Sequence, residues 1–215
     1  MVRRLAFTRL CETGWVSATP LEFLEEVFHH CDLLSFPART ALCHQSDEAG
    51  GLFGVVSSQL ALHLPGLNGD LGLAHIGGTG FWTGEFAALS GQPRKVSITA
   101  RSGCHVVRLS RANLANLLEK QPAGWRHIAM LVNINLRIAL DAVDALKRSD
   151  PLERVAMTIL NLINPAPPAP VRLDILQTEL AAIAQVSRAT INCTTAELER
   201  RGWLRRGYGS LEITD

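Results

Sequence analysis

The sequence predicts an α+β protein in which a block of short strands lies between helices, and three observations lead to this class. Short apolar runs separated by Gly, Pro, Asn and Asp fill residues 32–109, and strands at this spacing are typical of a barrel or a sandwich. A helical period then extends over residues 121–149. The C-terminal part contains two helical patterns joined by a tight turn and followed by two short strands.

Size and charge limit the class of protein. The chain has 215 residues, which is room for one large domain or two small ones. Its formal net charge is only +1, so any basic surface has to be local. The apolar run after the N-terminal arginines covers only residues 5–7, and no uncharged apolar stretch approaches membrane-spanning length. We therefore expect a cytoplasmic protein with no membrane partner.

Five cysteines are scattered along the chain without a CxxC pair. This pattern argues against a disulfide framework and against a zinc site, so we expect reduced, mostly buried thiols and no bound metal. The sequence also lacks GxSxG, P-loop and HExxH motifs and paired carboxylates in a plausible cleft. It therefore predicts no enzyme.

The first helix is expected to follow Thr19 as its N-cap, with Pro20 in the first helical position and Glu22 completing a capping box. Within the strand block, Asn68-Gly69 is a dipeptide that tolerates positive φ in a hairpin turn, and it predicts one strand pairing. After the strands, Ser110 is the expected cap of a short helix that ends near residue 120.

The long helix over residues 121–149 has apolar positions at alternating steps of three and four, which is the spacing of two helices that pack along their length. These seam positions are Trp125, Ile128, Val132, Asn135, Ala139, Ala142 and Leu146. Further apolar residues lie off the seam, so the helix has enough apolar surface for its own strand domain and for a second copy of itself. The alternative is a core helix buried within one domain.

A domain boundary is expected near Ser149. Asp150 is the predicted N-cap of a new helix, with Pro151 at its first position and Glu153 at its third. This helix stops at the stretch NPAPPAP, where four prolines exclude a helix or a central strand.

The last segment predicts a winged helix-turn-helix. One helix covers residues 177–184, a turn passes through Gln185 and Val186, and the second helix begins at its cap Ser187 and ends near residue 201. We expect Ile183, Val186, Ile191 and Leu198 to face inward. Two short strands around Gly207 and Gly209 form the wing.

Basic charge is concentrated in this segment. Residues 187–208 contain five arginines against two glutamates, a local net charge of +3. The first turn of the second helix offers free N–H groups and side chains suited to phosphates and base edges. The pattern therefore predicts a surface for duplex DNA; the alternative is a winged helix that only mediates protein contacts. The predicted DNA-binding residues are Ser187, Arg188, Ala189, Thr190, Asn192, Cys193, Arg205 and Arg206.

The order of these elements resembles the Crp/Fnr superfamily of bacterial transcription regulators. The most specific stretches are FPARTALCHQSDEAGGLFGVVSSQLALHLPG, GGTGFWTGEFAALSGQPRKVSITA and the helix-turn-helix. The resemblance implies that residues 1–120 form an antiparallel β-roll of the double-stranded β-helix or jelly-roll type that senses an effector. It also implies a dimerisation helix at 121–149 and a DNA-binding domain at 150–215. We expect a homodimer on a palindromic operator, and RNA polymerase as a partner. The expected interface residues are Ile128, Val132, Asn135, Ala139, Ala142 and Leu146.

The resemblance also locates an effector pocket from which this sequence departs. Gly84 and Glu85 match the pair whose glutamate holds a ribose hydroxyl, and Arg94 matches the arginine that grips the cyclic phosphate. Lys95 stands where a small residue is expected, and with Phe86 these are the predicted effector contacts. The hydroxyl pair that contacts the purine is replaced by Ala139 and Leu140, which cannot form side-chain hydrogen bonds. This argues against cyclic AMP as the effector. Two alternatives remain for Glu85 and Arg94: they bind another, unidentified ligand, or they form an internal ion pair in a roll that no longer senses an effector.

In the recognition helix, Arg188 matches an arginine that contacts guanine and Thr190 matches a phosphate contact. Ala189 and Cys193 replace a glutamate and an arginine, so the operator is expected to differ from the family's best-known half-site. Asn192 either contacts adenine through its amide or points to solvent. Cys193 is either a redox-sensitive thiol or a small residue that fits against a thymine methyl.

Two branches of the family carry cofactors. Cys11, Cys31 and Cys104 lack the spacing of the branch with an iron–sulfur cluster. His63, His75 and His105 lie in expected strands, where a lone histidine is more often structural than a haem ligand. We therefore expect neither cofactor. The predicted function is a DNA-binding regulator, and the alternative is a cyclic-nucleotide-type sensor that acts through protein partners.

Overall fold

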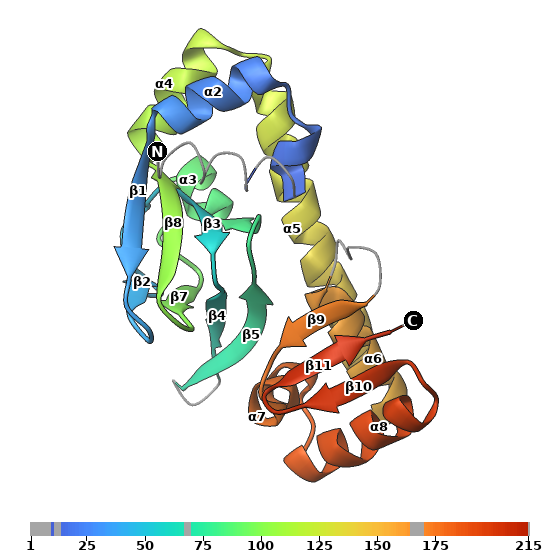
Figure 1. The fold of residues 1–215 in the computed structure, drawn as a ribbon. Coiled ribbons are helices and arrows are strands. Elements are labelled where there is room, and N and C mark those ends of the chain that lie inside the picture. Colours follow the sequence, from blue (N-terminus) through green and yellow to red (C-terminus); the bar gives the residue numbers. More distant parts are fainter. Residues whose placement is uncertain (1–9, 11–13, 67–69, 164–169, 215) are drawn as a thin grey trace. The chain divides into compact units, whose positions relative to one another are not determined.

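The computed structural model describes residue 10 and residues 14–66, 70–163 and 170–214. The chain divides into two compact units (Figure 1). The first unit runs to Leu71 and continues over His75–Asn135, and the second comprises Gly72–Ala74 and Leu136 onward. The fold is α+β, as predicted, and the two units are described separately.

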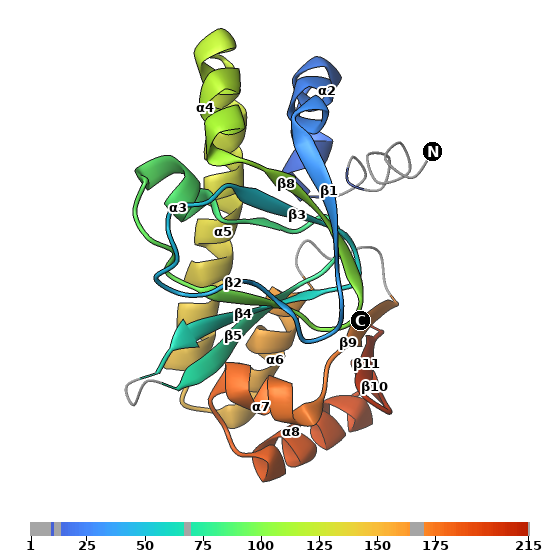
Figure 2. The same cartoon turned by 90° about the vertical axis from the view of Figure 1, so that its left-hand side faces the viewer.

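In the first unit, strands are interleaved between two sheets. Within the described residues each sheet has four strands. The first sheet has the order β1 (Cys31–Phe36), β8 (Cys104–Leu109), β3 (Leu52–Ser57), β6 (Trp82–Thr83). The second has the order β2 (Ala41–Cys43), β7 (Ser97–Ala100), β4 (Leu60–Pro65), β5 (Leu71–Gly77). Successive strands alternate between the sheets except at the step from β4 to β5, and the two sheets face each other (Figure 2). This confirms the antiparallel β-roll.

The roll has two apolar layers because its central strand β3 is buried on both faces. Phe53 and Val55 belong to the cluster between the sheets, which also contains Ile98 and Val106. The alternate residues Leu52 and Val56 belong to a second cluster shared with helices. This follows from the two-residue period of a strand. On the helix side, the indole rings of Trp15 and Trp82 meet edge to face with centroids 5.7 Å apart.

Helical segments contribute to that second layer. They are η1 (Gly14–Ala18), α2 (Leu21–His29), α3 (Glu85–Ser90), α4 (Arg111–Lys120) and the first part of α5 (Gly124–Lys147). Ser110 caps α4 as predicted, since its Oγ accepts a hydrogen bond from the main-chain N–H of Asn113 at 3.1 Å. The predicted cap of α2 is wrong. Pro20 occupies the N-cap position, and the Thr19 hydroxyl instead donates to the carbonyl of Trp15, because η1 offers it that acceptor at 2.8 Å.

The second unit contains the later part of α5 and the winged helix-turn-helix. Its elements are α6 (Pro151–Leu162), β9 (Val171–Asp174), α7 (Gln177–Ala184), α8 (Arg188–Arg200), β10 (Leu204–Gly207) and β11 (Ser210–Ile213). Asp150 caps α6 as predicted, accepting from the N–H of Leu152 at 3.0 Å. The wing strands pair antiparallel, and β9, which the sequence did not reveal, adds a third strand in the order β10-β11-β9.

Every element of this unit contributes buried apolar residues to its core. Its members include Val155, Ile159, Leu173, Leu180, Ile191, Leu198, Leu204 and Leu211. Of the four residues predicted to face inward in the helix-turn-helix, Ile191 and Leu198 are fully buried and Ile183 and Val186 are half-buried. The predicted turn at Asn68-Gly69 and the proline-rich stretch after α6 lie outside the described residues, apart from Pro170 at its end.

Loss of the α4 cap should destabilise the first unit. We expect Ser110→Ala to lower the free energy of unfolding by about 1 kcal/mol, because the N–H of Asn113 loses its acceptor. Chemical denaturation monitored by tryptophan fluorescence measures this change. Asn116→Ala is the control, since Asn116 is exposed in the same helix and its substitution should stay within about 0.5 kcal/mol. Equal effects of the two substitutions would contradict the cap.

Candidate nucleic-acid interface

The beginning of α8 is fixed by its cap. The Ser187 Oγ accepts from the main-chain N–H of Thr190 at 3.0 Å and lies 2.8 Å from the Thr190 hydroxyl. The preceding turn is set by Gln185, which has left-handed dihedral angles and closes α7. The cap satisfies one main-chain donor and leaves neighbouring N–H groups at the helix end for an anion.

The two sides of α8 differ in chemistry. Ile191, Thr194, Thr195 and Leu198 are buried, and the two threonine hydroxyls donate to main-chain carbonyls one turn earlier. The other side carries the predicted contacts. Ser187, Arg188, Ala189, Asn192 and Cys193 are exposed, and Thr190 is half-buried.

Glutamates hold three of the five arginines in this region. Both oxygens of Glu197 accept from Arg200 at 2.7 Å, and Oε1 also accepts from Arg201 at 2.7 Å. These hydrogen bonds lower the pKa of the Glu197 carboxyl to about 2. The third arginine, Arg206, is paired with Glu199 at 2.7 Å.

The guanidinium of Arg206, a predicted DNA contact, is turned towards α8, where Glu199 accepts hydrogen bonds from both its Nε and its main-chain N–H. Its neighbour Arg205 points to the other side of the strand, with a side chain 76% exposed and Nη1 3.9 Å from a Glu212 oxygen. Arg188 has no acidic partner among the described residues. Among these five arginines, Arg188 is thus the one without an acidic partner in the described residues, and Arg205 has the longest contact to its partner, Glu212.

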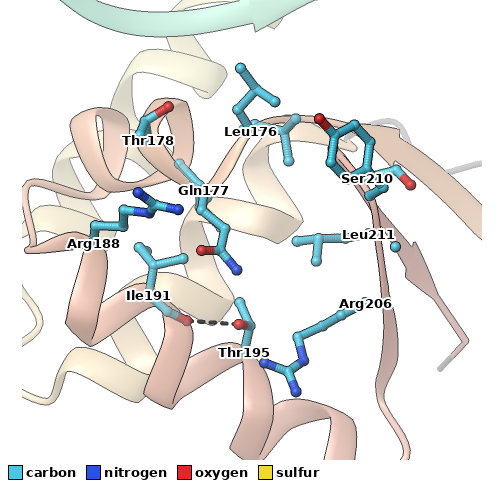
Figure 3. Close-up of a pocket in the computed structure, with 14 residues that line it drawn as sticks. Leu176, Gln177, Thr178, Arg188, Ile191, Thr195, Arg206, Ser210 and Leu211 are labelled. Carbon is cyan, nitrogen blue, oxygen red and sulfur yellow. Dashed lines mark hydrogen bonds between the residues drawn. The ribbon is translucent and has the colours of Figure 1, made fainter.

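A cleft of about 400 Å³ lies between α7, α8 and the wing (Figure 3). Its floor is apolar and includes Leu180, Ile191 and Leu211, while Gln177, Arg188 and Arg206 supply polar groups. At the wing tip, Tyr208 is fully exposed. The cleft therefore adjoins the recognition helix and offers hydrogen-bond donors from three different elements.

The predicted effector residues gather at the start of α3. Gly84 has φ +100°, and a Cβ there would lie 2.6 Å from the carbonyl oxygen of Gly51, so this position requires glycine. Arg94 is only 6% exposed. Its Nη2 donates to the Gly51 oxygen at 3.0 Å, and its guanidinium stacks over the Phe53 ring at 5.0 Å.

The internal ion pair that was one alternative for Glu85 and Arg94 does not form. Both residues are described, and Arg94 donates to the main-chain carbonyl of Gly51 instead. Glu85 Oε2 is buried and has no hydrogen-bond partner within the described part of the chain. Lys95 does not approach these groups but lies over the Phe86 ring, with Nζ 5.7 Å from its centroid.

The long helix α5 presents an apolar face to solvent that differs from the predicted seam. Its exposed large residues are Trp125, Val132, Leu136, Leu140, Val143 and Leu146. Two predicted interface residues are used within the chain instead. Ile128 is 1% exposed in the core of the roll, and the Asn135 amide donates to the carbonyl of Trp82 at 3.0 Å. Ala139 is exposed and Ala142 is half-buried. The exposed face is thus rotated by one residue towards Leu136, Leu140 and Val143.

The described residues offer no cluster of three metal-ligating side chains, and no described helix is long and apolar enough to cross a bilayer. Burial lowers the pKa of His75 to about 4. His63 bonds to Thr99 and His105 to Ser57, each at 3.1 Å. Cys31, Cys43 and Cys104 are buried, and Cys193 is exposed. Cys11 lies outside the described residues.

Sequence reasoning missed the partners of these functional groups. The spacing of Glu197 to Arg200 and Arg201, three and four residues, is a signal that the sequence offered. The pairing of Glu199 with Arg206 and the Gly51 carbonyl that binds Arg94 depend on contacts between different elements, for which the sequence has no local signal.

Comparison with known proteins agrees with both halves of the chain. Residues 33–121 match the cyclic nucleotide-binding domain, and residues 153–215 match the Crp-like helix-turn-helix domain. The cAMP-activated global transcriptional regulator CRP of Salmonella typhimurium is 24% identical over 181 residues, covering 82% of this chain and 86% of that protein. The cyclic AMP receptor protein of Thermus thermophilus is 27% identical over 180 residues, covering 84% and 82%.

Two solved structures have the same fold. FixK2 from Bradyrhizobium japonicum gives a TM-score of 0.75 at 16% identity and covers 86% of this chain and 93% of its own. The c-di-GMP responsive global regulator CLP of Xanthomonas campestris gives a TM-score of 0.68 at 20% identity, covering 91% and 100%. At this level of identity the likeness concerns the fold alone.

Cys193 should report on the surface of α8. Among the described cysteines we expect it to be alkylated first, because it is exposed while burial raises the pKa of Cys43 and Cys104. Adding duplex DNA should slow its alkylation, and raising the salt concentration should reverse the protection. Mass spectrometry of peptides measures each site separately. An alkylation rate at Cys193 that DNA does not change would contradict this placement of the interface.

Proposed function

The chain is a DNA-binding transcription regulator of the Crp/Fnr superfamily, and from this premise we propose that it is a homodimer that binds a palindromic operator through α8. One observation carries the proposal, namely the capped end of α8 with the exposed, unpaired guanidinium of Arg188. The proposed contacts are Ser187, Arg188, Ala189, Thr190, Asn192, Cys193 and Arg205. In a dimer, one recognition helix enters each half-site about one helical turn apart.

Three roles are proposed along the chain. Residues 1–120 form the sensor, residues 121–149 the dimerisation helix and residues 150–215 the DNA-binding domain. We also propose RNA polymerase as a partner and the cytoplasm as the location, and we assign no catalytic step. The alternative of a sensor that acts only through protein partners is not favoured, because the C-terminal half matches a Crp-like helix-turn-helix domain.

The apolar face of α5 supports self-association. Val132, Leu136, Leu140 and Val143 follow one another at steps of three and four and are exposed. An isolated helix face of this kind is expected to be covered by an equivalent face, as in a two-fold dimer. The proposed interface is therefore this face with Ala139 and Leu146.

The roll is proposed to respond to an effector other than cyclic AMP, or to none. Ala139 and Leu140 offer no side-chain hydrogen bond to a purine. Glu85 Oε2 is a buried acceptor without a described donor, which suits a ligand hydroxyl. Arg94 is bound to the Gly51 carbonyl, so an anion would have to compete with that contact.

Selection from a random duplex library by the reduced protein, without added ligand, tests the function. We expect an enriched palindrome, and we expect cyclic AMP to leave both the site and the affinity unchanged. Cyclic di-GMP is a second probe, because the structurally similar CLP is described as responsive to it. If no sequence is enriched with or without these nucleotides, the proposed operator binding is wrong. A strong requirement for cyclic AMP would overturn the proposal that the roll responds to another effector or to none.

Arg188 should contribute base specificity. We expect Arg188→Ala to reduce discrimination at one base position of each half-site by about 1–3 kcal/mol, because a guanidinium contact to a guanine edge is lost. Titrations of the selected operator and its single-base variants measure this. Arg200→Ala is a control that removes the same charge, but from a group already held by Glu197. Unchanged preference in Arg188→Ala would contradict the placement of the recognition helix.

The apolar face of α5 should control oligomeric state. We expect Leu140→Glu to yield monomers, because a carboxylate would be buried against the equivalent face, and to weaken operator binding since two half-sites are no longer linked. Light scattering after size exclusion measures the mass. Asn116→Glu places the same charge at an exposed position of α4, outside this face, and should remain dimeric. A dimeric Leu140→Glu protein would exclude this face as the interface.

A further inference from the structure

A side chain of the wing contacts the base-reading side of the recognition helix. Arg206 lies in β10 and reaches α8 at two places (Figure 3 shows its direction). Its Nε donates to Glu199 Oε2 at 2.7 Å, and its main-chain N–H donates to Glu199 Oε1 at 2.9 Å. Its Nη1 donates to the side-chain oxygen of Asn192 at 3.2 Å. Glu199 thus fixes the direction of the Arg206 side chain, and Arg206 in turn is hydrogen-bonded to the Asn192 amide.

This chain of contacts orients an exposed amide. Asn192 lies in the second turn of α8, on the side that carries Arg188 and Ala189. An asparagine amide has an acceptor end and a donor end that differ only in which way the group is turned. Because Arg206 donates to the oxygen, the oxygen is turned to the wing with one of its two lone pairs used, and the NH₂ group is turned the other way with its donors directed to another partner.

The orientation matters for base recognition. A bidentate contact to adenine needs the amide oxygen to accept from N6–H₂ while the NH₂ group donates to N7. In this chain Arg206 competes for that oxygen. The remaining donors suit an edge that offers acceptors, as guanine does with O6 and N7 and thymine does with O4.

We propose that Arg206 and Glu199 are positioning residues that hold Asn192 as a hydrogen-bond donor, so that α8 reads a guanine or a thymine at that base position instead of adenine. The inference rests on the proposed operator binding and adds a specificity determinant to it. It also gives Arg206 a function different from a phosphate contact. The Glu199 carboxyl supports this arrangement, since hydrogen bonds from the main-chain N–H and the side chain of Arg206 lower its pKa.

The test compares base preference at every operator position in variants of the full-length protein. Asn192→Ala first identifies the position that Asn192 reads, where we expect wild type to prefer guanine or thymine by about five-fold or more. Arg206→Ala should remove this preference or shift it to adenine at the same position, and should leave the position read by Arg188 unchanged. In the Asn192→Ala background, Arg206→Ala should have no further effect there.

Arg205→Ala is the matched control. It removes the same charge from the adjacent residue of β10, whose side chain faces away from Glu199 and lies near Glu212. We expect it to weaken binding to all sequences about equally and to reduce the salt dependence. Glu199→Gln is the second variant should Arg206→Ala fold poorly, and it should also change preference at the Asn192 position alone.

The outcomes separate the two proposals. If wild type enriches a palindrome but Arg206→Ala and Glu199→Gln keep its preference at the Asn192 position, the positioning role is wrong and operator binding stands. A wild-type preference for adenine at that position, or no position-specific effect of Asn192→Ala, would also overturn it. If wild type enriches no sequence under any condition, operator binding itself fails.

Discussion

The structure depends on how one helix divides its surface. α5 has 24 residues, and it buries Ile128 and Leu131 in the first unit while Ile138 and Ala145 are buried further along. A helix has room for more than one apolar stripe only if the stripes are separated around its axis. The residues left over form a continuous exposed apolar face. The end of the first unit, the exposed apolar face and the start of the second unit therefore share a single helix.

Several charged side chains of the winged helix are paired with one another within the unit. The count of arginines is right for a nucleic-acid surface, yet Glu197 and Glu199 hold three of them on α8 and the wing. Surface ion pairs of this kind contribute little stability, but they restrict where long side chains point. Arg188 lacks an acidic partner within the described residues and Arg205 lies 3.9 Å from Glu212, so the charge available on this surface depends on how each arginine is paired as well as on how many there are.

Sequence reasoning succeeded where the signal is local. The strand block, the caps at Ser110, Asp150 and Ser187 and the bounds of α7 follow from neighbours within four residues, and the structure confirms them. It failed where another acceptor competes for the same side chain. The Thr19 hydroxyl donates to the Trp15 carbonyl, only four residues away in η1, and the Asn135 amide donates to the distant carbonyl of Trp82. Two-residue β6 and six-residue α3 are too short for any periodicity to reveal. The sites are limited in the same way, because the start of α8 is predictable from the sequence but the hydrogen-bond partners of Arg94 and Arg206 are not.

The roles of Arg205 and Arg206 follow from the register of one hairpin. Gly207 pairs with Ser210, and Gly209 takes φ +66° in the two-residue loop that joins them. Arg206 then lies opposite Leu211 and Arg205 opposite Glu212, so their side chains leave the strand on opposite faces. A slip of one residue would exchange the two arginines, turning Arg206 away from Glu199 and Asn192. β11 also pairs with β9 along its other edge, where Leu211 lies opposite Leu173. This second pairing holds β11 in place and so helps to fix the register of the hairpin. The contacts of Arg206 with Glu199 and Asn192 of α8 therefore depend on strand pairing outside the helix-turn-helix itself.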